Sequence, residues 1–293
     1  YKRQYMSIPA AFDYHVAKSV DDAIALLQQY GDEGKLLAGG HSLLPTMKLR
    51  LAQPAHLIDL GRVSGLSYIR EEHDHVAVGA MTTYNKIERS DVLRRHFALL
   101  PEGTSEIGDQ QVRNRGTIGG SVAHADPSAD MPGLVLALKA TIVTRGPKGQ
   151  REIAADDFFQ DLFTTALEPD EIVTELRFPL PPAHSGSAYE KLANRASHYA
   201  IAGCAAVVTL NNDGICSAAS VVITGASVKA SRASAVESAL VGKRLDAATI
   251  ASASAHAASG LELVEDIHGS KAYRAQMTTV MAKRAISRAA ERA

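Results

Sequence analysis

Two short segments with paired glycines are the residues of this sequence best suited to chemistry. Ala38-Gly-Gly-His-Ser42 and Thr117-Ile-Gly-Gly-Ser121 each combine two adjacent glycines with hydroxyl side chains. Glycine permits a sharp turn with positive φ and leaves the backbone open to a ligand, because it has no Cβ. Successive exposed N–H groups then form a concave anion site, which suits a phosphate or pyrophosphate. Two such segments predict a long ligand with two phosphates held between them.

Both segments differ from the common nucleotide-binding motifs. Neither is G-x-G-x-x-G and neither is a Walker loop, so a Rossmann hydride site and a nucleoside triphosphatase site are disfavoured. A single glycine pair is more often only a tight turn, and it is the repetition of the pattern that favours a ligand.

Carboxylates and histidines follow the same segments. Asp126 and Asp130 are placed to accept hydrogen bonds from ribose hydroxyls, although each also suits a helix cap before Met131. His41, His124 and His198 could stack or hydrogen-bond, or could be solvated or structural, and their spacing does not resemble a metal site. No Ser-His-Asp set can be assembled from the sequence, so no catalytic or metal-binding residue is assigned.

The element order around the first glycine segment is helix, strand, glycine turn, helix. Ser19 is a suitable N-cap for a helix that runs to Tyr30, and the apolar residues 35–38 read as a buried strand. Helical spacing follows over 43–51, and 56–60 reads as another strand. The first glycine segment therefore feeds a helix N-terminus, whose partial positive charge favours an anion.

The middle of the chain predicts further strands and helices. Residues 67–70 and 76–79 predict a hairpin, and 116–128 fits no regular element, which in a compact domain is typical of a functional loop. The remaining predictions are helices over 84–90, 92–100 and 134–139 and strands over 141–144 and 172–178.

A proline-rich stretch marks the clearest boundary. Residues 179–186 are linker-like, since proline cannot continue a sheet interior. Apolar runs 202–210 and 215–223 flank Asn211-Asn-Asp-Gly214, a strong hairpin signal. Alanine-rich helices are predicted over 231–241, 247–258 and 270–291.

Composition excludes several function classes. The chain has 293 residues, enough for two domains, and its net charge of −1 shows no basic excess for nucleic acid. No apolar run approaches the roughly 20 residues that cross a bilayer, and no signal peptide is apparent, so a cytoplasmic protein is expected. Cys204 and Cys216 cannot supply four thiolates for an iron–sulfur cluster, and we expect both to be reduced and buried. Electron transfer by this chain would need an organic cofactor.

The glycine segments, taken with their neighbours, resemble a known family. Residues 38–48 (AGGHSLLPTMK), 116–120 (GTIGG) and 126–132 (DPSADMP) are similar to the FAD-binding medium subunit of molybdenum hydroxylases, the xanthine dehydrogenase family. Within it, the motifs are most similar to the aerobic carbon monoxide dehydrogenase branch, and the resemblance covers nearly the whole chain, including Ala188-Tyr-Glu-Lys-Leu192.

The resemblance implies an α+β fold in two domains. Residues 1–180 would form an FAD-binding domain of the vanillyl-alcohol oxidase and p-cresol methylhydroxylase type, with subdomains of about 1–62 and 63–180. Residues 187–293 would form a smaller α+β domain, with helices on a three-stranded antiparallel sheet.

The same resemblance implies a set of cofactor-binding residues. The two glycine segments would surround the FAD pyrophosphate, Asp130 would bind near the adenosine-side ribose, and the Val173 backbone and Lys191 would lie near the flavin ring. Tyr199 would also lie near the ring, although a buried strand tyrosine is the alternative; Ser121 stands where many relatives have asparagine. The full set is Ala38, Gly39, Gly40, His41, Ser42, Leu43, Thr117, Ile118, Gly119, Gly120, Ser121, His124, Asp130, Val173, Lys191 and Tyr199.

Partners follow from the resemblance as well. A large subunit would carry the molybdenum cofactor and a small subunit two [2Fe–2S] clusters, in a dimer of heterotrimers that passes electrons through FAD to quinone or another acceptor. A partner would account for any association with the inner face of the membrane.

The open alternatives are a xanthine, N-heterocycle or aldehyde dehydrogenase subunit, a self-sufficient flavin oxidase or reductase of the same fold, and a scaffold that has lost its cofactor.

Overall fold

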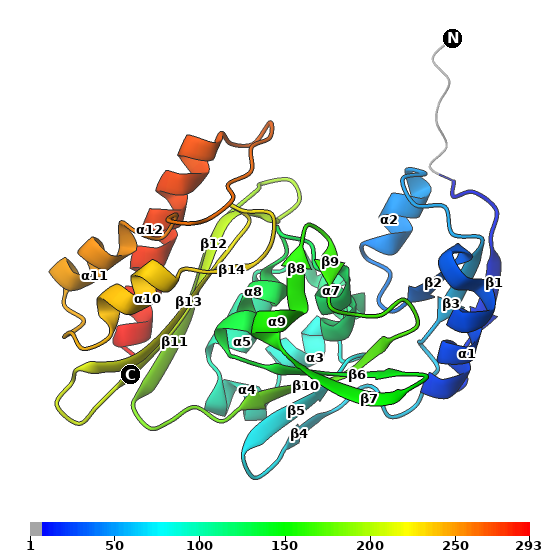
Figure 1. Cartoon of the computed structure of the whole chain (residues 1–293), viewed down its shortest axis with the longest axis horizontal. Helices are drawn as coiled ribbons and strands as arrows, with labels where there is room; N and C mark the ends of the chain where they lie inside the picture. Colours follow the sequence, from blue (N-terminus) through cyan, green and yellow to red (C-terminus); the bar gives the residue numbers. More distant parts are fainter. Residues whose placement is uncertain (1–7) are drawn as a thin grey trace.

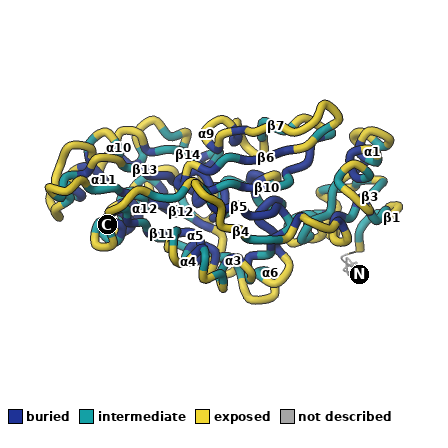
Figure 2. The backbone as a smooth tube through the Cα atoms, turned by 90° about the horizontal axis from the view of Figure 1, so that it is seen from below, coloured by how far each residue is buried: buried dark blue, intermediate teal, exposed yellow. Residues whose placement is uncertain are grey.

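The computed structural model of the protein describes residues 8–293. Three larger β-sheets follow one another along the molecule, from the N-terminal unit through a central unit to a C-terminal domain (Figure 1). Buried residues gather along the middle of the molecule, and exposed residues lie on the outer turns (Figure 2). The α+β class expected from the sequence is confirmed.

The N-terminal unit is a three-stranded parallel sheet in the order β1-β3-β2. Helix α1 begins where the Ser19 side chain accepts from the Asp22 amide, and its apolar face packs on this sheet. Helix α2 follows β2 after the first glycine segment and ends at Lys48, earlier than the predicted 51. The elements are β1 (Asp13–Val16), α1 (Val20–Tyr30), β2 (Gly34–Leu37), α2 (Leu43–Lys48) and β3 (His56–Asp59).

The central unit is a five-stranded antiparallel sheet in the order β4-β5-β10-β6-β7. Its strands are β4 (Ile69–Glu71), β5 (His75–Gly79), β6 (Thr141–Gly146), β7 (Gly149–Ala154) and β10 (Ile172–Pro179). Its helices are α3 (Tyr84–Glu88), α4 (Asp91–His96), α5 (Leu99–Ser105), α6 (Gln110–Arg115), α7 (Ile118–His124), α8 (Asp130–Ala137) and α9 (Ala155–Phe158). A small hairpin of β8 (Phe159–Asp161) and β9 (Thr164–Thr165) precedes β10.

The prediction that residues 116–128 form no regular element is wrong, because they contain α7. The Thr117 side chain caps this helix by accepting from the Gly120 amide at 3.3 Å. Ile118 and Val122 are completely buried beneath it. Tertiary packing therefore stabilises a helix that its two glycines would disfavour in isolation.

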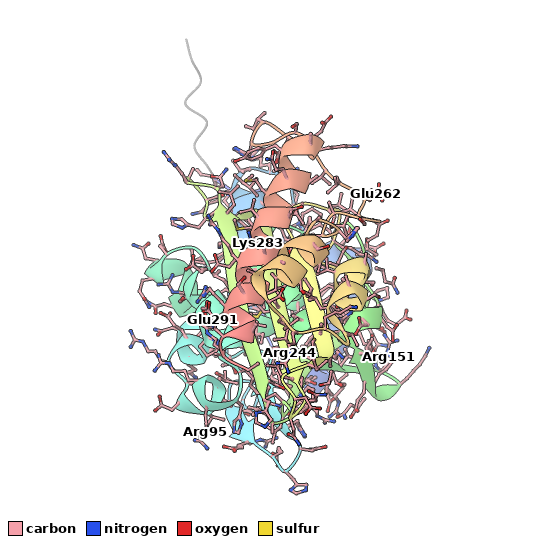
Figure 3. All side chains as sticks on the ribbon, turned by 90° about the vertical axis from the view of Figure 1, so that its left-hand side faces the viewer. Arg95, Arg151, Arg244, Glu262, Lys283 and Glu291 are labelled. Atoms are coloured by element: carbon pink, nitrogen blue, oxygen red, sulfur yellow. The ribbon has the colours of Figure 1, made fainter. Side chains whose placement is uncertain are left out.

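The C-terminal domain is an antiparallel sheet in the order β11-β12-β13-β14. Its elements are β11 (Ser185–Ala193), β12 (Ala200–Leu210), β13 (Cys216–Thr224), β14 (Ser231–Arg232), α10 (Ser234–Leu240), α11 (Ala247–Ser254) and α12 (Lys271–Ala290). The expected three-stranded sheet is corrected to four strands, because Ser231 and Arg232 pair with β13 instead of starting a helix. Helix α12 crosses the sheet with Lys283 and Glu291 exposed to solvent (Figure 3). The two cysteines are free and buried, as expected.

Helix α8 is packed between the rest of the central unit and the C-terminal domain. Every one of its residues is buried, since α5 and α7 contact it within the central unit while β12 and β13 contact it from the C-terminal sheet. Its sequence is apolar nearly all round, as expected for a helix covered on several sides. Each buried Leu or Val side chain contributes roughly 1.5–3 kcal/mol, so the two parts hold α8 firmly in place.

The start of β10 is fixed by a buried carboxylate. Glu171 accepts from the Arg151 guanidinium at 2.6 Å, the Thr144 hydroxyl at 2.8 Å and the Glu168 amide at 3.0 Å. Burial alone would raise the pKa of Glu171, but these hydrogen bonds lower it below the usual range. The ionised form is therefore the one that stabilises this corner of the sheet.

We expect Glu171→Gln to lower the free energy of unfolding by about 2 kcal/mol at pH 7, because charge-assisted hydrogen bonds are lost. A carboxyl with a lowered folded pKa stabilises fully above its unfolded value of about 4.5, and this contribution disappears as pH falls through the folded pKa. The difference between wild type and variant should therefore shrink below about pH 4.5. Urea unfolding from pH 3 to 8 measures it, with exposed Glu262→Gln as control. A difference independent of pH would contradict this account.

Candidate functional site

The two glycine segments lie against each other although about 80 residues separate them. A Cβ placed on Gly39 would stand 2.2 Å from the carbonyl oxygen of Arg115 and 2.8 Å from the Gly116 Cα. A Cβ on Gly120 would stand 3.4 Å from the Ala38 Cβ. Only glycine fits at position 39, because no L side chain tolerates a backbone atom that close. Helix α7 lies on the side of the central unit that faces β2 (Figure 1).

The first segment presents unpaired backbone donors. Gly40 has φ +77°, the left-handed conformation that favours glycine, and its carbonyl accepts from Leu44 at the start of α2. Within residues 8–293, the N–H groups of Gly40, His41 and Ser42 donate to no protein acceptor. The exposed His41 ring lies with Nδ1 3.1 Å from the Gly39 oxygen. Three successive N–H groups without a protein acceptor are an arrangement that suits an anion.

The second segment differs from this expectation, because its amides already have partners. Ile118 donates to the Thr82 oxygen at 3.1 Å and Gly119 donates to the Ala80 oxygen at 2.8 Å. The Gly120 amide donates to the side chain of Thr117, which is itself buried. A Cβ on Gly119 would stand 2.5 Å from the Ala80 Cβ, so this glycine serves close packing. The second segment thus supplies hydroxyl groups, and few of its N–H groups are free within residues 8–293.

Two tyrosines reach the glycine segments from other elements. Burial raises the pKa of Tyr199, the Asp126 charge adds to the rise, and the Ser42 hydroxyl opposes it. Burial raises the pKa of Tyr84 strongly, and the Ser121 hydroxyl opposes it from the second segment. Tyr199 is 39% exposed, so it is no buried core residue. The Ser42 side chain makes no capping bond to α2 and stays available.

Asp130 and Lys191 form a buried ion pair. The Lys191 Nζ lies 2.9 Å from the Asp130 carboxylate, and their side chains are 1% and 4% exposed respectively. The Tyr189 hydroxyl donates to the other carboxylate oxygen at 2.5 Å. Burial raises the pKa of Asp130, and the Lys191 charge opposes the rise. The three donors of the Lys191 ammonium are engaged by the Asp130 carboxylate and the carbonyls of Glu106 and His198, so a hydrogen bond from Lys191 to a ligand would require one of them to open. The Asp130 carboxylate keeps further acceptor capacity.

The remaining predicted residues lie around the same segments. Leu43 is half-buried in the first turn of α2. His124 ends α7, with its ring centroid 5.1 Å from that of the exposed Phe163 ring, and burial lowers the pKa of its imidazole. Val173 is 6% exposed in β10 and its side chain belongs to the main core, which leaves its backbone for any contact with a ligand.

Several residues of the site were missed from the sequence. The Tyr84 ring packs against Gly116, so closely that a Cβ on Gly116 would stand 2.4 Å from the ring. Arg115 supplies the carbonyl that faces Gly39. Tyr189 completes the buried ion pair. These are contacts between distant segments, and no local pattern of residue types signals them.

Comparisons with known proteins agree with this arrangement. Residues 10–181 match the family model described as the FAD binding domain in molybdopterin dehydrogenase, and residues 187–289 match the carbon monoxide dehydrogenase flavoprotein C-terminal domain. No helix in residues 8–293 is long and apolar enough to span a membrane.

Individual relatives match over almost their full length. The chain is 43% identical to the carbon monoxide dehydrogenase medium chain of Hydrogenophaga pseudoflava, covering 96% of this chain and 98% of that one. It is 38% identical to 6-hydroxypseudooxynicotine dehydrogenase complex subunit alpha of Paenarthrobacter nicotinovorans, covering 97% and 96%. A solved structure of the Hydrogenophaga carbon monoxide dehydrogenase matches with a TM-score of 0.94 at 45% identity, over 98% of this chain and all of that chain.

We expect Gly39→Ala to reduce FAD affinity at least about tenfold, because the new methyl group forces the two segments apart. Flavin fluorescence titration of the purified full chain measures the affinity. Gly65→Ala is the control. Gly65 has φ +79° and nothing lies within 4 Å of a Cβ there, so this substitution adds backbone strain but no steric clash. Equal affinities in both variants would show that the contact between the segments does not serve the cofactor.

Proposed function

Because the chain belongs to the family of FAD-binding subunits of molybdopterin dehydrogenases, we propose that it transfers electrons within a complex of several subunits, from iron–sulfur clusters on a partner to an external acceptor. It is an oxidoreductase subunit that binds FAD. Its fold matches that of the related subunit along the whole chain.

The N–H groups of Gly40, His41 and Ser42, which have no acceptor within the described residues, carry the proposal. A pyrophosphate supplies several anionic oxygens, and successive backbone donors bind such a group well. The contact of Gly39 with Arg115 brings the hydroxyl-bearing second segment beside these donors. The residues present therefore fit the diphosphate of FAD.

FAD, when bound, supplies the ability to accept and deliver electrons, and the protein's part is to hold and shield it. Residues 38–43 would bind the pyrophosphate, and Thr117 and Ser121 would add hydroxyl contacts. Tyr199 would cover one part of the flavin ring and limit the access of water. His124, the Val173 backbone, Asp130 and Lys191 would complete the proposed set.

Partner subunits would carry the other redox groups. The sequence has two cysteines, both buried, so it cannot hold a cluster with four thiolate ligands. Two of its relatives carry the name medium chain or complex subunit. We propose a large molybdenum subunit and a small iron–sulfur subunit as partners, assembled as a dimer of heterotrimers. Quinone is the proposed acceptor, and a partner would provide any attachment to the membrane.

Carbon monoxide is the proposed substrate of the complete enzyme. Support comes from 43% identity to a carbon monoxide dehydrogenase medium chain, against 38% to the subunit of 6-hydroxypseudooxynicotine dehydrogenase. The solved Hydrogenophaga structure aligns over 98% of this chain, which supports domains of about 1–180 and 187–293. The oxidation site would lie on another chain.

We expect the native complex to contain three kinds of chain, together with molybdenum, iron and FAD, and to reduce an artificial dye with carbon monoxide. Native mass spectrometry and metal analysis give the composition, and a dye assay gives the substrate. The full chain with FAD alone should show no activity, because the oxidation site is proposed to lie on another chain. Dye reduction by an N-heterocycle or aldehyde but not by carbon monoxide would reassign the substrate. A native chain without partners would contradict the proposal.

We expect Tyr199→Ala to keep FAD bound but to change the flavin absorption spectrum and slow reoxidation by the acceptor about fivefold, equivalent to about 1 kcal/mol. The reason is that an aromatic neighbour sets local polarity and access to the flavin ring. Tyr199→Phe keeps the ring and removes only the hydroxyl near Ser42, so it should behave like wild type. Stopped-flow absorbance of the holoenzyme separates reduction from reoxidation. An unchanged spectrum and rate in the alanine variant would remove Tyr199 from the flavin site.

A further inference from the structure

An open hollow lies on the surface of the central unit, apart from the glycine segments. It has a volume of about 520 Å³ and lies between the chain that enters β4 and the outer side of α3. Figure 2 shows β4 beside α3 in this part of the molecule. Among the described residues, its lining shares no member with the proposed FAD-binding set. The lining consists of residues 67–69, Asn85, Lys86, Arg89 and Ser90.

The two walls of the hollow are held together by hydrogen bonds. The Tyr68 amide donates to the hydroxyl of Thr82 at 3.1 Å, and that hydroxyl donates to the Tyr68 carbonyl at 3.0 Å. Thr82 is completely buried just before α3. The Tyr68 hydroxyl donates to Glu175 in β10, and the Lys86 Nζ reaches across to the Ser67 hydroxyl at 2.8 Å. The hollow therefore keeps its shape without a ligand.

Two cations face the hollow without a counter-charge. Lys86 and Arg89 are three residues apart on α3 and at its end, and both are exposed. Within residues 8–293, the Lys86 ammonium bonds only to the Ser67 hydroxyl and the Arg89 guanidinium forms no ion pair. Asp91, at the start of α4, lies 3.5 Å from Arg94. Residues three apart on a helix lie on the same side, so the two positive charges converge on one region.

Other carboxylates beside the hollow already have cationic partners. Glu88 in α3 pairs with Arg113 at 2.9 Å. Glu175, the acceptor of the Tyr68 hydroxyl, pairs with Arg177 at 2.6 Å. The described lining itself contains no acidic residue. Since like charges repel, an anion bound between the two cations gains energy that no protein carboxylate supplies.

The rest of the lining offers apolar surface and hydroxyl groups. Tyr68 and Ile69 are half-buried, and the Arg70 guanidinium carbon lies 4.5 Å from the centroid of the Tyr68 ring. The Ser90 hydroxyl accepts from the Leu93 amide, and its own hydrogen is still able to donate. A volume of this size with apolar walls and a few polar groups suits a small organic molecule. An inorganic anion alone would leave the apolar walls unused.

We propose that this hollow, called the β4–α3 site below, binds a small organic anion. Its carboxylate or phosphate group lies between Lys86 and Arg89, where charge-assisted hydrogen bonds are strong. Its apolar part lies on Tyr68 and Ile69. The inner side of α3 carries the buried Tyr84, whereas the outer side carries the two cations, so the β4–α3 site is separate from the glycine segments. The proposal does not depend on the proposed function.

Phenyl phosphate is a suitable probe because it carries both an anion and an apolar ring. We expect it to bind the full chain with a Kd of about 5 mM or lower, measured from the broadening of its phosphorus NMR signal. Inorganic phosphate and benzyl alcohol, which each carry one part only, should bind at least about fivefold more weakly. Benzoate in competition shows whether a carboxylate serves as well as a phosphate. Binding of neither phenyl phosphate nor benzoate at about 20 mM would overturn the proposal, as would equal binding of inorganic phosphate.

Substitutions locate the bound probe. The double variant Lys86→Met, Arg89→Gln should fold, judged by circular dichroism, because both side chains are exposed, and should lose about tenfold or more in affinity. Arg89→Lys keeps the charge and should stay within about threefold of wild type. Lys148→Met, which removes an exposed cation from the β6–β7 turn, is the control and should not change the affinity. Unchanged affinity in the folded double variant would overturn the proposal.

FAD separates the β4–α3 site from the glycine segments. Phenyl phosphate should bind equally well with and without saturating FAD, because the two ligands occupy different places. Displacement of phenyl phosphate by FAD would place the probe at the glycine segments and overturn the β4–α3 site.

Discussion

The close approach of Gly39 to the carbonyl of Arg115 is the constraint on which the site depends. It brings a turn of the N-terminal unit into van der Waals contact with the end of a helix in the central unit. No side chain mediates this contact, so its geometry is set by two backbones and cannot adjust through rotamers. The free donors of Gly40 to Ser42 on one side and the hydroxyl of Ser121 on the other acquire their relative positions from it.

The two glycine segments perform different tasks, although they look alike in sequence. The first leaves its N–H groups free and bends through a left-handed residue. The second uses its N–H groups in a helix cap and in bonds to the turn that follows β5, and Gly119 allows close packing against Ala80. The first segment thus offers the N–H donors for a ligand. The second segment packs closely on its neighbours and determines the position of the first.

Much of the fold could be predicted from local patterns, but contacts between distant residues could not. Helix α1, with its Ser19 cap, and the hairpin at Asn211 depend on neighbouring residues, and the structure has both. Helix α7 was missed because Ile118 and Val122 stabilise it only through tertiary burial. In the site, the glycine segments are visible as a pattern. The hydrogen bonds that occupy all three donors of the Lys191 ammonium cannot be seen in the sequence, because their acceptors come from three separate segments.

Helix α8 has a consequence for how such chains diversify. Its side chains are shared between helices of the central unit and the C-terminal sheet, so neither part has a closed surface without the other. The connecting residues 180–184 lie largely at the surface and look like a convenient point for recombination. A hybrid joined there would mismatch the faces of α8 and leave apolar area exposed. The whole chain is therefore the unit that can be inherited, exchanged or fused to new partners.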